Sequence, residues 1–376
     1  MADEYVEEFD SRDLAQMRKK IASWFRNAQR DLPWRVERNA YRVWVSEIML
    51  QQTTVQAVVP YFERFMQQFP TVETLAQSEE ADVLRLWEGL GYYSRARNLR
   101  AGAIQVCEQF NGQVPKQVDE LLGIKGIGRY TAGAIASFAY NQPAPILEAN
   151  TLRLFARLLA YDGDPKSAAG QRQLWALAEM FASCRNPAKV NEALMELGAL
   201  VCRVSAPQCD ACPLKSSCRA FLSGRQEELP VLQKRIAVTR VVDACVAIQR
   251  KNKWLVRQRT SEERWAGMWD FPRFSVESVD HDGKLTPAIS RRLHEEVRQT
   301  LLRDWNVTAE IHDDLMEVRH TVTRYRIRLL ALIANWQEGS PSDGEIRWVT
   351  TQQLAELPLS VTARRIADWL HERHTS

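Results

Sequence analysis

The sequence lacks long hydrophobic runs. Its apolar stretches are short, such as residues 329–334, whereas a membrane-spanning helix needs about 20 consecutive apolar residues. The first eight residues also lack the basic and apolar segments of a secretory signal. We therefore expect a cytoplasmic protein with no membrane contact.

A strong charge of either sign is absent as well. Fifty Lys and Arg against 47 Asp and Glu give a formal net charge of +3, so the chain as a whole offers no general attraction to nucleic acid. With 45% hydrophobic and 26% charged residues, the composition excludes collagen-like and disordered chains. The length of 376 residues is enough for two or three domains.

The hydrophobic pattern changes near residue 230. Before it, apolar residues recur at helical spacing in residues 42–56, 81–87, 96–110, 130–140 and 188–201, and we expect about ten helices and no strand. After it, residues 238–249, 254–259, 315–320 and 324–336 predict strands, and residues 287–304 and 362–372 predict helices. A mainly α N-terminal part is thus followed by a linker at 223–235 and an α+β domain over 236–376.

Four of the seven cysteines lie close together in the sequence: Cys202, Cys209, Cys212 and Cys218. In a reducing compartment such a group favours metal over disulfides. Four thiolates at these separations can hold either tetrahedral zinc or an iron–sulfur cube. Zinc sites usually contain two close pairs, and here only Cys209 and Cys212 are close, so the spacing favours the cube.

A glycine-rich loop precedes a predicted helix at residues 122–132. Glycines such as Gly126 and Gly128 let the backbone turn sharply and approach a partner closely. The amides that open the next helix form an anion site. The pattern matches a helix-hairpin-helix, which holds a DNA phosphate without reading the base sequence.

Together, the hairpin and the cysteine motif resemble the helix-hairpin-helix DNA glycosylases that carry a 4Fe–4S cluster. In the endonuclease III branch a nucleophilic Lys follows the hairpin Gly-Arg, whereas Tyr130 stands there in this chain and cannot form a Schiff base. Residues 30–35, 44–53, 89–98 and 191–199 resemble the MutY-type adenine DNA glycosylases and cover the helical part almost end to end.

This resemblance implies a monofunctional enzyme. Members of the family hydrolyse the glycosidic bond of adenine mispaired with 8-oxoguanine or G in double-stranded DNA, after rotating the adenine out of the duplex. The catalytic region would span 1–222, with a six-helix barrel at about 34–140 and a 4Fe–4S cluster domain built from 1–33 and 141–222. We expect a monomer that is associated with the nucleoid if the source is bacterial.

The resemblance also implies the site residues. Glu47 would be the acid that protonates adenine N7, and its apolar and amide neighbours predict a raised pKa. Glu148, Tyr130 and Asn150 would support the sugar side, where positive charge develops. The remaining positions are the adenine pocket, formed by Arg30, Leu32, Trp34, Arg35 and Glu192, and the wedges on the 8-oxoguanine side, Gln52 and Tyr92.

One position departs from the family pattern. The family reads Ile-Leu-Asp-Gly-Asn, and residues 146–150 here read Ile-Leu-Glu-Ala-Asn. The carboxylate arm of Glu148 is longer by ~1.5 Å, and a displacement near ~1 Å can cost ~100-fold in rate. We expect Glu148 still to place an anion beside C1′, because the small Ala149 leaves room for the chain to shift.

The C-terminal domain resembles the Nudix-like domain that recognises 8-oxoguanine in this family. Residues 265–272 match its opening, but Arg292 and Arg298 replace a Glu and the Gly of a Nudix box, so we expect no pyrophosphate hydrolysis. The family's Phe-Ser-His loop corresponds to residues 322–324, in which Thr323 keeps only the hydroxyl. Two alternatives stay open: a catalytically weakened mismatch-binding protein, and an endonuclease III-like bifunctional glycosylase.

Overall fold

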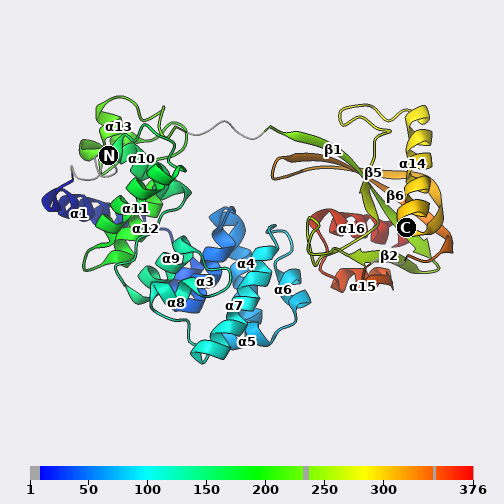
Figure 1. Cartoon of the computed structure of the whole chain (residues 1–376), viewed down its shortest axis with the longest axis horizontal. Coiled ribbons are helices and arrows are strands. Elements are labelled where there is room, and N and C mark those ends of the chain that lie inside the picture. Colours follow the sequence, from blue (N-terminus) through cyan, green and yellow to red (C-terminus); the bar gives the residue numbers. More distant parts are fainter. Residues whose placement is uncertain (1–8, 232–236, 342–343, 376) are drawn as a thin grey trace. The chain divides into compact units, whose positions relative to one another are not determined.

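The computed structural model describes residues 9–231, 237–341 and 344–375 (Figure 1). The chain divides into two compact units: Met1–Ser78 with Asn98–Lys234, and Glu79–Arg97 with Arg235–Ser376. Within the described ranges, no helix is long and apolar enough to cross a membrane. The first eight residues, which the sequence predicts to lack a secretory signal, and residues 232–235 of the predicted linker lie outside the described residues.

Residues 9–231 form helices and no strand, as the periodicity predicts. The α-helices are α1 (Ser11–Ala28), α2 (Pro33–Val36), α3 (Ala40–Leu50), α4 (Val55–Gln68), α5 (Val72–Gln77), α6 (Glu80–Leu86), α7 (Ser94–Phe110), α8 (Val118–Leu122), α9 (Arg129–Tyr140), α10 (Ala149–Leu159), α11 (Ala168–Ala182), α12 (Pro187–Leu200) and α13 (Arg219–Leu222). Two 3-10 turns, Cys209–Ala211 and Lys215–Ser217, follow α12.

The prediction of one helix over residues 42–56 is wrong. Helix α3 ends at Leu50 and α4 begins at Val55, because Gln52 adopts a φ of +58° that a right-handed helix cannot contain. The side chain of Thr54 then caps α4 by accepting the amide of Ala57. A polar loop therefore stands between the two helices.

Helix α3 is buried along nearly its whole length. Trp44 and Val45 have no exposed surface, and the polar Ser46 and Glu47 are buried beside them. A helix that is apolar almost all round belongs to the interior. The carboxyl of Glu47 is therefore carried into the protein by the packing of its own helix.

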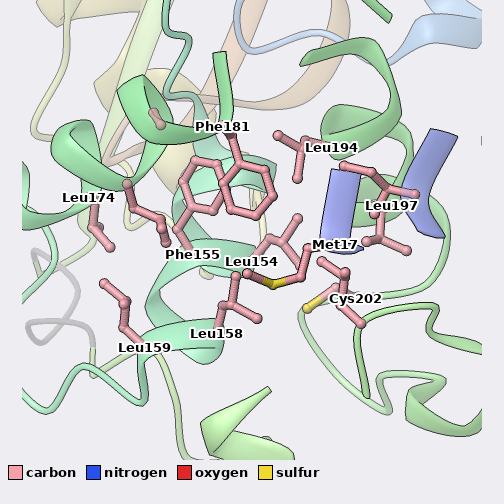
Figure 2. Packing of buried hydrophobic residues seen from close by; sticks show 14 of the residues in the cluster. Met17, Leu154, Phe155, Leu158, Leu159, Leu174, Phe181, Leu194, Leu197 and Cys202 are labelled. Carbon is pink, nitrogen blue, oxygen red and sulfur yellow. The ribbon is translucent and has the colours of Figure 1, made fainter. Parts of the chain in front are cut away.

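One hydrophobic core of the first unit is built by helices from both ends of that unit (Figure 2). It contains Met17 of α1, Leu154 and Phe155 of α10, Phe181 of α11 and Leu197 of α12. The rings of Phe155 and Phe181 stack with centroids 5.6 Å apart. This packing fixes α10 beside α12, the two helices that carry Glu148 and Glu192.

Gly198 permits the close approach of these two helices. A Cβ at this position would lie 2.8 Å from both the Cβ and the carbonyl oxygen of Asn150, a distance that real side chains do not adopt. Any larger residue at position 198 would therefore displace the start of α10.

The second unit contains a mixed sheet with helices on both faces. Its strands are β1 (Thr239–Arg250), β2 (Lys253–Gln258), β3 (Trp269–Asp270), β4 (Arg273–Ser275), β5 (Val307–Val322), β6 (Tyr325–Gly339) and β7 (Ile346–Val349). The order is β3-β2-β1-β6-β5, with β4 paired to β1 and β7 to β2, and β1 runs parallel to β6. Helices α14 (Pro287–Trp305), α15 (Thr351–Glu356) and α16 (Val361–Thr375) belong to the same unit, as does α6.

Each face of the sheet has its own core. Leu293, Val297 and Leu301 of α14 pack on one face, and Ile366 and Leu370 of α16 pack on the other. The predicted class, a mainly α part followed by an α+β part, is confirmed. Only β5 is much longer than its predicted core of residues 315–320, because its register shifts between Ile311 and Leu315 and interrupts the alternation there.

Candidate active site

A cavity of about 820 Å³ opens in the first unit between α2, α3, α9, α10 and α12. It collects eleven of the residues singled out from the sequence: Arg30, Leu32, Trp34, Arg35, Glu47, Gln52, Gly128, Tyr130, Glu148, Asn150 and Glu192. Gly126 lies in the hairpin turn rather than in the lining, and Tyr92 and Thr323 belong to the other unit.

Glu47 and Tyr130 meet inside this cavity. The Tyr130 hydroxyl donates a 2.5 Å hydrogen bond to Oε2 of Glu47, and only 4% of Glu47 is exposed. Burial raises the pKa of Glu47 to about 7; the hydrogen bond from Tyr130 opposes this, and the charge of Glu148 adds to it. Burial also raises the pKa of Tyr130 well above its ordinary value, so its hydroxyl keeps its proton and acts as a donor.

Glu148 caps the N-terminus of α10. Its Oε2 accepts the amide of Asn150 at 2.8 Å and its Oε1 accepts the amide of Thr151 at 2.9 Å, while Thr151 Oγ1 accepts the amide of Glu148. Burial raises the pKa of Glu148, and the two amides act in the opposite direction. The longer arm thus folds back onto the helix start instead of extending past it.

The loss of the family's glycine after this carboxylate costs the backbone nothing. Ala149 is the first residue of α10 and does not have a positive φ. Because only a positive φ would favour glycine here, alanine fits the position without strain.

Two buried glutamates on α12 face three arginines across the cavity. Glu196 Oε2 and Oε1 lie 2.8 Å from Arg30 Nε and from Arg35 Nη1. Glu192 Oε1 lies 3.4 Å from Arg35 Nε, and its Oε2 lies 3.0 Å from Arg38 Nη2. Glu196 and Arg38 were not singled out from the sequence; the available signal was the spacing of four between the two glutamates, which places both on one helix face.

Arg153 connects the cavity to the cysteine segment. Its Nη2 donates to Asn150 Oδ1 at 3.0 Å and to the carbonyl of Gly198 at 2.7 Å, and its Nε donates to the carbonyl of Cys202 at 2.7 Å. One turn later, Arg157 Nη1 donates to the sulfur of Cys202 at 3.3 Å. Both arginines are buried, and sequence reasoning missed them because charged helix residues are usually solvent-exposed.

The four clustered cysteines line one small cavity together with Arg157 and Leu214. All four are free thiols. Burial raises the pKa of the Cys212 thiol to about 12, with neighbouring thiols adding to the effect. In the described part of the chain, no three His, Cys, Asp or Glu side chains gather closely enough to hold a single metal ion. Four thiols that line one cavity supply the donor set that an iron–sulfur cluster requires.

The hairpin between α8 and α9 has the geometry that its glycines predict. Gly126 has a φ of +86°, and a Cβ there would lie 2.7 Å from the Cβ of Asn98. Gly128 caps α9, and nothing lies within 4 Å of where its Cβ would be. Ile124 and Ile127 are buried and anchor the turn. The space beside Gly128, at the start of α9, is therefore open.

In the second unit, the carboxylates of the degenerate Nudix box have other partners. Glu296 accepts the amides of Glu277 and Ser278 at 2.8 and 3.0 Å, and Glu295 pairs with Arg298. Thr323 lies in the turn between β5 and β6 with a φ of +51°, and its hydroxyl donates to the carbonyl of Val322. Glu295 and Glu296 thus both have partners within the second unit.

Comparison with known proteins places both halves of the chain. Residues 45–180 match the HhH-GPD superfamily base excision DNA repair protein, and residues 244–369 match the NUDIX domain. The adenine DNA glycosylase of Buchnera aphidicola subsp. Acyrthosiphon pisum (strain APS) is 36% identical over 255 residues, which are 68% of this chain and 73% of that protein.

Two longer relatives match as well. The adenine DNA glycosylase of Arabidopsis thaliana is 35% identical over 360 residues, covering 85% of this chain and 57% of that protein. That of Rattus norvegicus is 43% identical over 233 residues, covering 59% of this chain and 45% of that protein. The chain thus spans about half the length of these two relatives. Since it covers most of the bacterial relative at 36% identity, the chain belongs to the adenine DNA glycosylase family.

Proposed function

We propose that this protein is a monofunctional DNA glycosylase that removes adenine mispaired with 8-oxoguanine or G from duplex DNA. The observation that carries the proposal is the pair formed by Glu47 and Tyr130: a buried carboxyl with a pKa of about 7 inside a cavity that holds a second carboxylate, Glu148. An acid and a carboxylate on opposite sides of a glycosidic bond are the groups that its hydrolysis requires.

The reaction needs one proton and one water. Protonated Glu47 donates to adenine N7, and the bond between C1′ and N9 breaks with its electron pair going to the base. The carboxylate of Glu148 stabilises the positive charge that develops on the sugar. Water then forms the new bond to C1′ and returns a proton to Glu47. Asn150, held by Arg153, orients the sugar side.

The cavity is large enough for a base rotated out of the duplex, since small-molecule sites occupy roughly 300–1,000 Å³ and this one measures about 820 Å³. Leu32 and Trp34 supply apolar surface, while Arg30, Arg35 and Glu192 offer hydrogen bonds to the base edge. On this proposal Gln52 and Tyr92 enter the base stack, and Thr323 contacts 8-oxoguanine.

Double-stranded DNA is the proposed partner of a monomeric protein. The start of α9, where the space beside Gly128 is open, suits a backbone phosphate. Such a contact holds DNA of any sequence, so recognition of the mispair is left to the cavity and to the second unit.

A 4Fe–4S cluster is the proposed cofactor, held by Cys202, Cys209, Cys212 and Cys218, whose thiols line one cavity. When bound, such a cluster supplies iron–thiolate bonds that fix the loop after α12, and it can exchange an electron. None of the chemical steps above uses it.

One observation favours a second candidate, a mismatch-binding protein. Both carboxylate oxygens of Glu148 already accept backbone amides of α10. If those bonds persist when DNA is bound, the carboxylate is less able to approach C1′. Binding without base release would then be the activity.

A single-turnover assay on duplexes with A opposite 8-oxoguanine, G or C tests the proposal. We expect free adenine from the first two duplexes and no strand cleavage before alkali treatment. Tight binding without adenine release would support the mismatch-binding protein. Strand cleavage by the protein itself would support the bifunctional alternative.

A further inference from the structure

Glu196 lies outside the predicted adenine pocket, yet it forms ion pairs with two arginines of the cavity. Only 1% of this residue is exposed, and each of its two oxygens lies 2.8 Å from a different guanidinium, those of Arg30 and Arg35. Both arginines line the cavity. A buried carboxylate shared by two cations fixes the orientation of both.

Arg35 is the cation whose direction matters most. Its Nη1 is held by Glu196 and also donates to the carbonyl of Arg30 at 3.0 Å, while its Nε faces Glu192. The planar guanidinium can satisfy these partners only in one orientation, along α12. In that orientation two carboxylates of α12 balance its charge.

We propose that Glu196 is a positioning residue, whose carboxylate holds Arg30 and Arg35 against α12 and so keeps them from turning toward Glu47. The proposal rests on the function proposed above and assigns a role to a residue outside the expected adenine pocket. Without Glu196, the two arginines would turn to the remaining carboxylates of the cavity, among them Glu47 and Glu148.

The groups that act on Glu47 come from four elements. They are Tyr130 of α9, Glu148 at the start of α10, Arg35 of α2 and Glu192 of α12. Burial raises the pKa of Glu47 most strongly, and among these groups the hydrogen bond from Tyr130 and the charge of Arg35 lower it. The other charged residues of the lining are Arg30, Arg38, Arg129 and Glu196. If Arg35 were free to turn toward Glu47, it would therefore lower the pKa of Glu47 below that in the natural protein.

The test uses the full chain and its variants, and follows adenine release in single turnovers from about pH 5 to about pH 9. With Glu196→Gln we expect the maximal rate to fall at least ~10-fold, because the arginines are no longer oriented, and the pH of half-maximal rate to move down. With Arg35→Gln that pH should move up, since the cation that lowers the pKa of Glu47 is lost, and in that background Glu196→Gln should no longer move it down. Glu196→Asp keeps the charge, so its pH of half-maximal rate should equal that of the wild type.

A second measurement does not depend on catalysis. Infrared difference spectra against Glu47→Gln follow the ionisation of the Glu47 carboxyl in the protein without DNA, and the midpoint should move in the same two directions. If no protein releases adenine, the proposed function fails, and the infrared midpoints still decide the role of Glu196.

Asp270→Asn serves as a matched control, because Asp270 is a buried carboxylate paired with Arg259 at 2.8 Å in the other unit. It should lower thermal stability without moving the Glu47 midpoint. Should Glu196→Gln fail to fold, the smaller Glu196→Ala, which removes the same charge, carries the test. An unchanged midpoint in a folded Glu196→Gln or Glu196→Ala would show that Glu196 is only structural and would overturn the proposal.

Discussion

The hydroxyl of Tyr130, on α9, donates a 2.5 Å hydrogen bond to Oε2 of Glu47, on α3. Burial favours the protonated form of Glu47 and the hydrogen bond favours the ionised form, and the balance raises its pKa to about 7. A general acid is most effective when its pKa lies near the working pH, because it can then both hold and release a proton.

This relationship predicts how the rate depends on pH. Glu47 must be protonated to act as the acid, so single-turnover adenine release should fall as the pH rises through about 7. Tyr130→Phe removes the hydrogen bond that lowers the pKa of Glu47, and the fall should then occur at higher pH. Tyr140→Phe is the control: it removes a hydroxyl from the same helix that donates to Val114 instead. A rate that rises through pH 7 in the wild type would mean that Glu47 acts as a base.

Replacement of the acid itself should separate chemistry from binding. Glu47→Gln keeps the volume of the side chain but cannot protonate adenine, so base release should be lost while binding of the mispaired duplex survives. The measurement is single-turnover release together with a DNA titration. Glu179→Gln, an exposed change on α11, should leave both unchanged. Activity of Glu47→Gln within about tenfold of wild type would exclude Glu47 as the essential acid.

The sequence predicts element types well because the two hydrophobic periods differ clearly in the two halves. It misses the break between α3 and α4, since residues 51–53 contain neither Gly nor Pro and Gln52 takes its positive φ from the tertiary structure. The local sequence pattern does not predict a positive φ at a glutamine. The same limit hides the bulge that interrupts β5.

The residues of the site also fall into two groups, those that the sequence predicts and those that it misses. Residues within quoted motifs, such as Glu47 and Tyr130, can be expected at the site from sequence, and the structure brings them into one cavity, although their roles stay predictions. Arg153 could not be found, because a charged residue on a helix is ordinarily solvated; for Glu196 the only signal is its spacing of four from Glu192 on the same helix face. Their partners come from distant parts of the chain: Arg153 donates to the carbonyls of Gly198 and Cys202, and Glu196 pairs with Arg30 and Arg35.

The residue after the hairpin Gly-Arg predicts whether the protein also cleaves the DNA strand after it releases the base. Tyr130 has no amine, so borohydride should trap no covalent adduct between protein and DNA above background. Gel electrophoresis after reduction provides the measurement, and Glu47→Gln supplies the background. A strong adduct would reveal another attacking amine and would contradict the monofunctional assignment.

The cysteine cavity predicts the metal content. Protein purified without oxygen should be brown, with broad absorbance at about 400 nm and about four iron atoms per chain. Cys209→Ser should reduce the iron, whereas Cys184→Ser should not, since Cys184 does not line that cavity. Metal analysis that finds stoichiometric zinc and no iron would contradict the prediction.

The carboxylate at position 148 decides between an enzyme and a binding protein. Glu148 sits at the edge of the cavity as the cap of α10, and its amide partners stabilise the ionised form. If this anion stabilises the sugar cation, Glu148→Gln should lose at least ~100-fold in single-turnover rate. The neutral side chain also weakens the cap by about 1 kcal/mol, which thermal unfolding would record separately from the rate.

Glu148→Asp gives the complementary result. Aspartate is a favoured N-cap residue and shortens the arm by ~1.5 Å, so the variant should fold, release adenine and equal or exceed the natural rate. If Glu148→Gln instead behaves like wild type, the carboxylate takes no part in the reaction and the mismatch-binding protein is favoured. If only Glu148→Asp releases adenine, the amides of Asn150 and Thr151 hold the longer carboxylate too far from the sugar, and the natural chain is a binding protein that one shortened side chain converts into an enzyme.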